Sequence, residues 1–153
     1  MQSNDSSSAP LWCHLFLRQR AGWKLEGNTF AVSPVIGQAT SLNSLAQGET
    51  AIGSALSPVF TLIKGENLLE VTLQGGNSQR VDGSENLSLR LVDAKTGKVF
   101  KELTASGSHI LTAYQMPIDG LEERPLRLLL QDRNASDSYA WIGIRNISAR
   151  AHP

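Results

Sequence analysis

The sequence predicts an all-β domain folded as an antiparallel β-sandwich of eight or nine strands. Three observations lead to this prediction. Short alternating or apolar segments recur along the chain, clusters of Gly, Asn, Asp and Ser separate them, and helical periodicity is nearly absent. A chain of 153 residues is long enough for one domain with its own core. We expect a flexible leader or linker over residues 1–10 and a single sandwich domain over residues 11–150.

The first half of the chain gives the weaker strand signals. Leu11–Leu17 is the first candidate, and Trp23–Phe30 is a second that glycines interrupt. The stretch Ser33–Glu49 is rich in small and polar residues, so we expect a long loop there. Ile52–Phe60 predicts a strand, and Pro58 indicates that it lies at a sheet edge or at a strand start.

The second half gives clearer signals. Leu68–Leu73 alternates between apolar and polar residues, and we expect Gly75-Gly76-Asn77 to end it. In the next strand Leu87, Leu89 and Leu91 share one face. The turn Asp93–Gly97 then predicts a hairpin into Lys98–Leu103. Three further strands complete the set: Ile110–Met116, Leu126–Asp132 and Trp141–Ser148.

Composition excludes several classes of function. Fourteen basic residues balance fourteen acidic ones, without the basic excess typical of a nucleic-acid-binding domain. Cys13 is the lone cysteine, so no intrachain disulfide can form, and a buried free thiol is the simplest interpretation. No apolar stretch approaches the length of a membrane span, and the polar opening lacks the basic start of a signal peptide.

Several short motifs occur in an order that resembles a known family. The order is Gly22-Trp23-x-x-Glu26-Gly27-x-x-Phe30, Gly53-x-x-x-Ser57-Pro58-x-Phe60, Gly75-Gly76, Leu89-x-Leu91-x-Asp93, Leu128-x-Leu130-x-Asp132 and Trp141-Ile-Gly-Ile-x-Asn146-Ile147. It is similar to the galactose-binding-domain-like jelly roll of bacterial cell-surface and envelope proteins. The resemblance implies a carbohydrate-binding module outside the cytoplasm, periplasmic or at the cell surface. Asn146 departs from the pattern, which usually has Asp at that position.

Four residues are candidate ligand contacts. Arg80 follows the Gly-Gly segment and Asp132 ends a strand, so both are expected at the ends of the sandwich, where charged side chains can bind sugar hydroxyls. A solvated loop charge is the alternative for each. Tyr139 and Trp141 could stack on a sugar ring, and for Trp141 the alternative is a core position between isoleucines.

The sequence carries no motif for catalysis. The histidines are scattered without the spacing of a zinc site, and Gly-x-Ser-x-Gly, phosphate-loop and dinucleotide fingerprints do not occur. No cofactor is expected. The family resemblance allows a structural calcium, although no calcium-loop spacing is present.

These observations lead to one functional expectation and two competitors. The expectation is a non-catalytic carbohydrate-binding module within a larger bacterial protein, with a carbohydrate or a protein as its partner and no membrane insertion. The first competitor is a structural or protein-interaction sandwich without a sugar site, which Asn146 favours. The second is a sandwich hydrolase, which needs a Ser or Asp beside His14 or His109.

Overall fold

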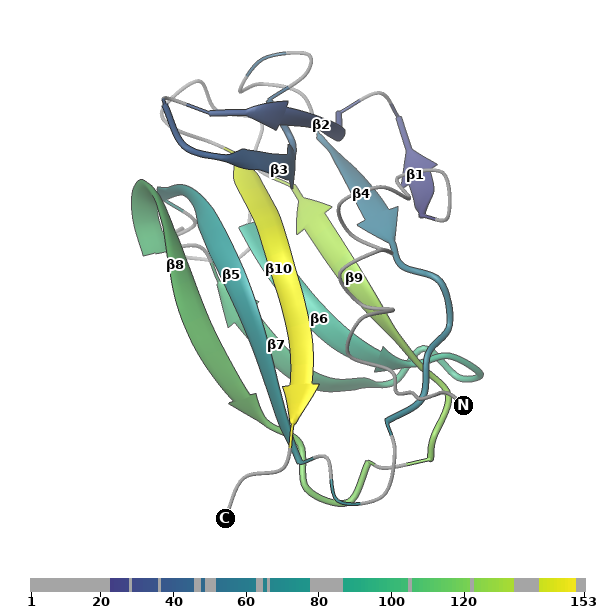
Figure 1. Cartoon of the computed structure of the whole chain (residues 1–153). Helices are drawn as coiled ribbons and strands as arrows, with labels where there is room; N and C mark the ends of the chain where they lie inside the picture. The colour runs from purple at the N-terminus through teal and green to yellow at the C-terminus, as the bar shows by residue number, and fades with distance from the viewer. Residues whose placement is uncertain are drawn as a thin grey trace, which may run out of the picture.

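The computed structural model consists of two antiparallel sheets packed face to face (Figure 1). It describes residues 23–27, 29–35, 37–45, 48, 52–62, 65, 67–77, 87–104, 106–121, 123–133 and 141–150. These residues form ten strands and no helix, so the predicted all-β sandwich is confirmed. The predicted strand Leu11–Leu17 lies outside the described residues.

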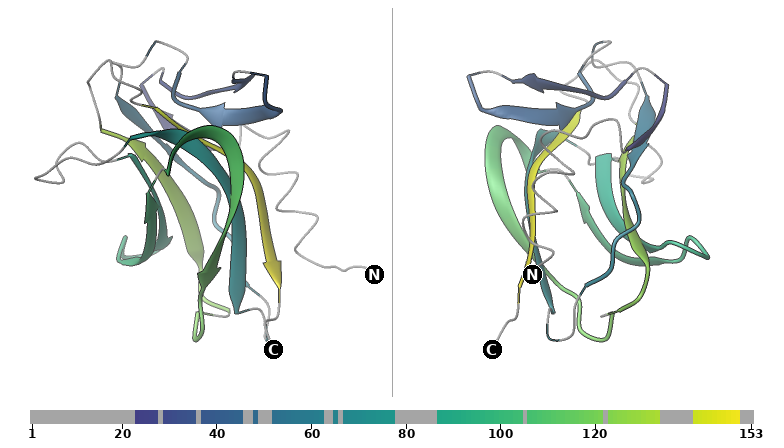
Figure 2. Two further views of the ribbon diagram at one scale, coloured as in Figure 1. Left: turned by 90° about the vertical axis from the view of Figure 1, so that its left-hand side faces the viewer. Right: turned by 45° about the vertical axis from the view of Figure 1, so that its right-hand side comes forward.

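Sheet A has the strand order β1-β4-β9-β6-β7. Its strands are β1 (Lys24–Glu26), β4 (Gly53–Leu56), β9 (Leu126–Asp132), β6 (Leu87–Asp93) and β7 (Val99–Thr104). Sheet B has the order β2-β3-β10-β5-β8, and Figure 2 shows β10 (yellow), β5 (teal) and β8 (green) next to one another. Its strands are β2 (Ala31–Pro34), β3 (Thr40–Asn43), β10 (Ile142–Arg150), β5 (Leu68–Asn77) and β8 (Ser106–Pro117).

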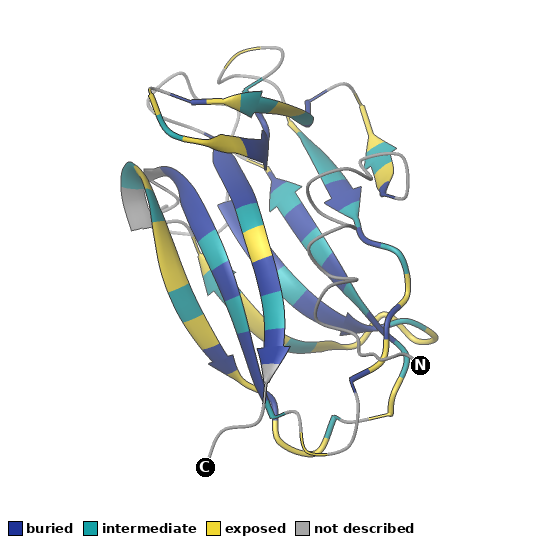
Figure 3. Ribbon diagram, in the orientation of Figure 1, coloured by how far each residue is buried: buried dark blue, intermediate teal, exposed yellow. Residues whose placement is uncertain are grey.

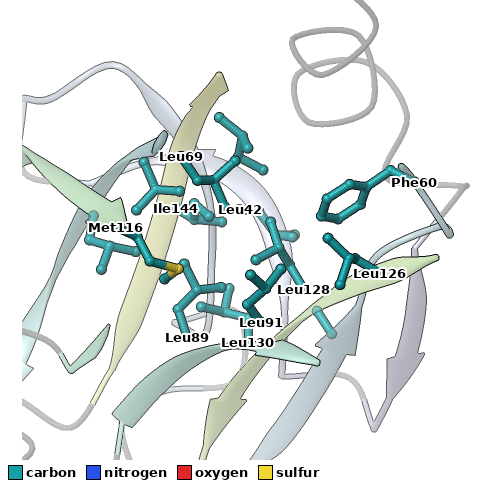
Figure 4. Packing of buried hydrophobic residues seen from close by; sticks show 14 of the residues in the cluster. Leu42, Phe60, Leu69, Leu89, Leu91, Met116, Leu126, Leu128, Leu130 and Ile144 are labelled. Atoms are coloured by element: carbon teal, nitrogen blue, oxygen red, sulfur yellow. The ribbon is translucent and has the colours of Figure 1, made fainter. Parts of the chain in front are cut away.

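The core fills the space between the sheets. In β9 the even-numbered residues from Leu126 to Asp132 are buried and the odd-numbered ones are half-buried, and Figure 3 shows this alternation along the strand. Leucines of sheet A face apolar residues of sheet B, and the labelled members in Figure 4 include Leu89, Leu91, Leu128, Leu130, Leu42, Leu69, Met116 and Ile144. At about 25 cal/mol per Å² of apolar surface, this burial is the main source of stability.

The prediction of a long loop over Ser33–Glu49 is wrong. β2 and β3 form a hairpin inside it, and β3 pairs with β10 through Leu42 opposite Ile144. The strand was hidden because Ser41 and Asn43, its outward-facing residues, are polar and yet fully buried. This hairpin also explains why the structure has more strands than the eight or nine that we expected.

Two other details differ from expectation. β5 does not end before Gly75 but continues to Asn77, because Gly75 pairs with Ile142 on one side and Ser108 on the other. β4 is not an edge strand, and Pro58 lies two residues beyond its last residue, Leu56. Beyond it Phe60 forms a bridge with Leu126.

The hairpin predicted at Asp93–Gly97 is confirmed. The N–H of Asp93 donates to the carbonyl of Lys98 over 2.8 Å, and the N–H of Gly97 donates to the carbonyl of Asp93 over 2.8 Å. Gly97 has a φ of 80°, which side chains with a Cβ rarely adopt. The turn therefore has the residue type that its backbone requires.

Candidate functional site

The outer face of sheet A carries two rows of side chains in register. One row runs from Lys24 through Leu56 and Leu129 to Arg90 and Glu102. The neighbouring row runs from Glu26 through Ser54, Gln131 and Ser88 to Thr104. Because strand residues alternate between faces, both rows point away from the core, toward which Leu25 and Leu130 point.

This face is hollowed over β1, β4 and β9. One hollow of about 380 Å³ lies toward Gly27 and Arg133, and a second of about 400 Å³ lies toward Asp93 and Gly97. The two hollows share the lining residues Glu26, Ser54 and Gln131. We call the combined depression, lined by Lys24, Glu26, Ser54, Leu56, Arg127, Leu129 and Gln131, the sheet A groove.

The floor of the groove combines an apolar strip with polar side chains. Leu56 and Leu129 lie opposite each other on neighbouring strands and supply the apolar strip. Beside them lie Glu26, Ser54 and Gln131, which line both hollows. Their carboxylate, hydroxyl and amide groups can form hydrogen bonds with the hydroxyls of a ligand.

The cations of the groove are unpaired, whereas cations nearby are paired. Lys24 and Arg127 line the groove and make no ion pair with a described residue. Arg90, in contrast, donates to Glu102 over 2.6 Å, and Arg124 lies 3.7 Å from the carboxylate of Asp93. Arg133, which lines the hollow toward Gly27, also makes no ion pair with a described residue, so three cations and the exposed carboxylate of Glu26 line the two hollows.

The carboxylate of Asp93 is committed to its own turn. Its Oδ1 accepts hydrogen bonds from the N–H of Lys95 over 2.7 Å and of Thr96 over 3.0 Å. The backbone N–H of Thr96 and then that of Lys95 lower the pKa of Asp93 below its ordinary value, and the charge of Arg124 adds to this effect. Asp93 is therefore a charged structural group of the hairpin at neutral pH.

The structure describes two of the four predicted contact residues. Arg80 and Tyr139 lie outside the described residues. Asp132 is at the end of β9, the central strand of sheet A, where it borders the hollow near Arg133, but its side chain is fully buried on the core-facing side. Trp141 is 1% exposed, so it offers no ring face to a sugar, and the core interpretation describes this residue.

No aromatic ring of the described residues lines the groove. Trp23, like Trp141, is buried, while Phe100 and Tyr114 are half-buried and pack against the core. Two cations also contact the ring of Phe100. Nζ of Lys98 lies 5.7 Å from the ring centroid, and the guanidinium of Arg124 lies 5.5 Å from it. Apolar contact in the groove therefore comes from leucine side chains.

The described residues bring no catalytic or metal-binding set together. The ring of His109 has no hydrogen bond or ion pair within the described part of the chain, and His14 lies outside it. The same part holds no cluster of three His, Cys, Asp or Glu side chains suited to a metal ion. It also holds no helix with the length and apolar character of a membrane span.

Sequence reasoning did not find the groove, although a signal was present. Leu126–Asp132 was predicted as a strand, but no role was predicted for Arg127, Leu129 and Gln131. Residues at this spacing share one face of a strand, and in the structure all three line the groove together with residues of β1 and β4. Which strands lie beside β9 could not be predicted from the sequence.

Comparison with known proteins gives a match in fold. No family model matches the chain, and no curated protein matches its sequence. Among solved structures, CsCBM6-3 from Clostridium stercorarium, in complex with cellobiose, has a TM-score of 0.55 at 8% identity, over 84% of this chain and 87% of that one. TmCBM61, in complex with β-1,4-galactotriose, has a TM-score of 0.53 at 12% identity, over 85% and 88%.

A third similar structure comes from a different class of protein. It is a cleaved adhesin domain of Lys-gingipain from Porphyromonas gingivalis, with a TM-score of 0.54 at 12% identity, over 90% of this chain and 94% of that one. Identities this low establish the fold and nothing finer. The chain therefore has the β-sandwich fold of these two carbohydrate-binding modules and of the adhesin domain.

Proposed function

We propose that the chain is a non-catalytic carbohydrate-binding module and that the sheet A groove binds a saccharide. The observation that carries this proposal is an apolar strip, Leu56 and Leu129, beside polar side chains that line both hollows, among them the amide of Gln131. A sugar ring has an apolar C–H face and a polar rim of hydroxyls. Leucine side chains fit the first, and an amide oxygen accepts from the second.

The fold supports the same proposal, because two of the similar structures carry saccharides. We also place the module outside the cytoplasm, as a domain of a larger bacterial protein. This placement rests on the resemblance to modules of bacterial cell-surface proteins. Arg80 and Tyr139 remain proposed contacts, since loops beside a binding face commonly add polar and aromatic groups.

Affinity electrophoresis and calorimetry with a panel of neutral and acidic polysaccharides test this function. We expect at least one polymer to retard the protein. Replacing Gln131 with Ala should weaken that binding about tenfold, the loss expected for one hydrogen bond in a desolvated site. Gln115→Ala, on exposed β8, is the matched control and should bind like the wild type.

One observation favours a second function, a protein-interaction domain without a sugar site. The groove has no aromatic ring among the described residues, and aromatic stacking is a common source of sugar affinity. If no polysaccharide in the panel retards the protein, the carbohydrate proposal fails and this second function replaces it. Arg80→Ala and Tyr139→Ala in the same experiment determine whether the loops contribute.

A further inference from the structure

We infer that the sheet A groove selects an anionic saccharide, one that carries carboxylate or sulfate groups. The inference rests on the proposed function, because it names the class of ligand for the same groove. Its basis is the pair Lys24 and Arg127, which lie on either side of the leucine strip. Neither the fold nor the need for apolar contact accounts for two unpaired cations there.

The register of sheet A fixes how the two cations are placed. Lys24 is opposite Leu56, and Leu56 is opposite Leu129 on the next strand. Arg127 lies two residues before Leu129 and therefore on the same face. Strand spacing and rise place the Cα atoms of Lys24 and Arg127 about 12 Å apart, with the leucine strip between them.

The charges around the groove distinguish these two cations from their neighbours. Arg90 and Arg124 lie close by, and each has a carboxylate, Glu102 and Asp93 respectively. Asp93 is held by backbone N–H groups as well, so it is not available to neutralise Arg127. An arginine fork and a lysine ammonium that line one groove favour carboxylate or sulfate oxygens.

The remaining carboxylate gives the groove a direction. Glu26 lies where the two hollows meet, and its Oε1 accepts a hydrogen bond from Oγ of Ser54 over 3.3 Å. A carboxylate there accepts hydrogen bonds from sugar hydroxyls and repels an acidic group. Lys24 and Arg127 line the hollow on one side of Glu26 and Arg133 lines the other, so we expect the acidic group of the ligand on the side with two cations, and its hydroxyls toward Glu26 and Gln131.

Polymers that differ only in charge test this inference. Polygalacturonate is compared with its carboxyl-reduced form, and carrageenan with its desulfated form, by calorimetry on the whole chain. We expect an acidic polymer to bind, and its neutral counterpart to bind about ten- to hundredfold more weakly, the range for hydrogen bonds to charged groups. The polymer pair that shows the difference identifies the acidic group as carboxylate or sulfate.

Charge variants locate the effect. Lys24→Gln and Arg127→Gln should each weaken binding of the acidic polymer about tenfold and leave binding of its neutral form unchanged. Lys101→Gln, which removes a lysine in register with core-facing Leu91, is the matched control and should have no effect. Raising sodium chloride from about 0.05 to about 0.5 M should weaken wild-type binding of the acidic polymer. The affinity of a variant that carries both Lys24→Gln and Arg127→Gln should not change with salt.

The possible results test the preference for an anionic saccharide separately from the proposed carbohydrate-binding function. If neutral and acidic forms bind equally and the charge variants match the wild type, the inference is overturned while the carbohydrate-binding function stands. If no polymer of either kind binds, both are overturned. Circular dichroism of each variant confirms that the fold is intact before its affinity is compared.

Discussion

Asp93 shows how one side chain holds a turn through its charge. Two backbone N–H groups, those of Lys95 and Thr96, donate to the same carboxylate oxygen, and Arg124 lies near the other oxygen. Because these contacts favour the ionised form, the pKa of Asp93 in the folded chain lies below its ordinary value of 3.8. The carboxylate therefore stabilises the fold only while it is charged.

Asp93→Asn should lower the stability of the chain at neutral pH and not at acidic pH. The wild-type advantage is fully present above about pH 4 and is lost as pH falls through the lowered pKa of the folded state. Melting temperatures of both proteins, measured from about pH 7 down to about pH 2, check this. A constant difference across that range would contradict the charge argument.

Gly143 lies where an added Cβ would be tight against its neighbours, and these neighbours, Asn43 and Gln74, are fully buried and hydrogen-bonded, so they cannot easily move away. A Cβ built there would be 3.0 Å from Cβ of Asn43 and 3.1 Å from Oε1 of Gln74. Gly143→Ala should therefore lower the free energy of unfolding by about 1–3 kcal/mol, the usual cost of overpacking. Denaturant unfolding measures it. Ser148→Ala, on the same outer face of β10, is the control, and an equal effect of both substitutions would exclude steric conflict as the cause.

Roles that a residue plays through neighbours in sequence could be predicted. Roles that depend on residues far away along the chain could not. The turn at Asp93 could be predicted because its residues and their partners are adjacent in sequence. Gly143 could not be explained beforehand, since the atoms that exclude its side chain come from β3 and β5. The same reason hid Gln131, whose environment is set by strands that are far away along the chain.

At the scale of elements, an irregularity in β8 depends on one buried glutamine. Between the pairs Leu73–Thr112 and Gly75–Ser108, three residues of β8 face the single residue Gln74. Nε2 of Gln74 donates to the carbonyl of His109 over 2.6 Å, and its Oε1 accepts from Oγ of Ser41 over 2.5 Å. This fully buried side chain therefore links β8 to the β2–β3 hairpin.

Gln74→Ala should loosen that part of β8 while leaving the rest of sheet B paired. The carbonyl of His109 loses its donor, which costs about 1–3 kcal/mol when the group stays buried. Amide hydrogen exchange should accelerate at residues 108–112 more than in β10. Gln115→Ala, also on β8 but exposed, is the control, and uniform acceleration across the sheet would contradict a local role.

The success of element prediction followed the placement of polar residues. Leu126–Asp132 was predicted with its observed bounds because it is a short, mostly apolar run that a polar segment follows. Thr40–Asn43 was missed because two of its polar residues, Ser41 and Asn43, are fully buried and hydrogen-bonded, as when Nδ2 of Asn43 donates to the carbonyl of Ser33 in β2 over 3.2 Å. A strand with buried polar residues lacks the apolar or alternating pattern on which such a prediction depends.

At the scale of the whole molecule, the two last strands of the chain organise the sandwich. β9 is the central strand of sheet A, and β10 is the central strand of sheet B. Each pairs on both sides with strands from earlier in the chain. Neither sheet is complete before the C-terminal segment is in place, so both sheets should form in one cooperative step.

Truncating one core residue in each central strand tests this cooperativity. Leu130→Ala in β9 and Ile144→Ala in β10 should each lower the free energy of unfolding by about 2–5 kcal/mol, since both side chains are fully buried. Leu129→Ala, half-buried on the outer face, should cost less. In calorimetry each variant should melt in a single transition, at a lower temperature than the wild type. Two separated transitions would show that the sheets unfold independently, because a core that both sheets share should not melt on one side alone.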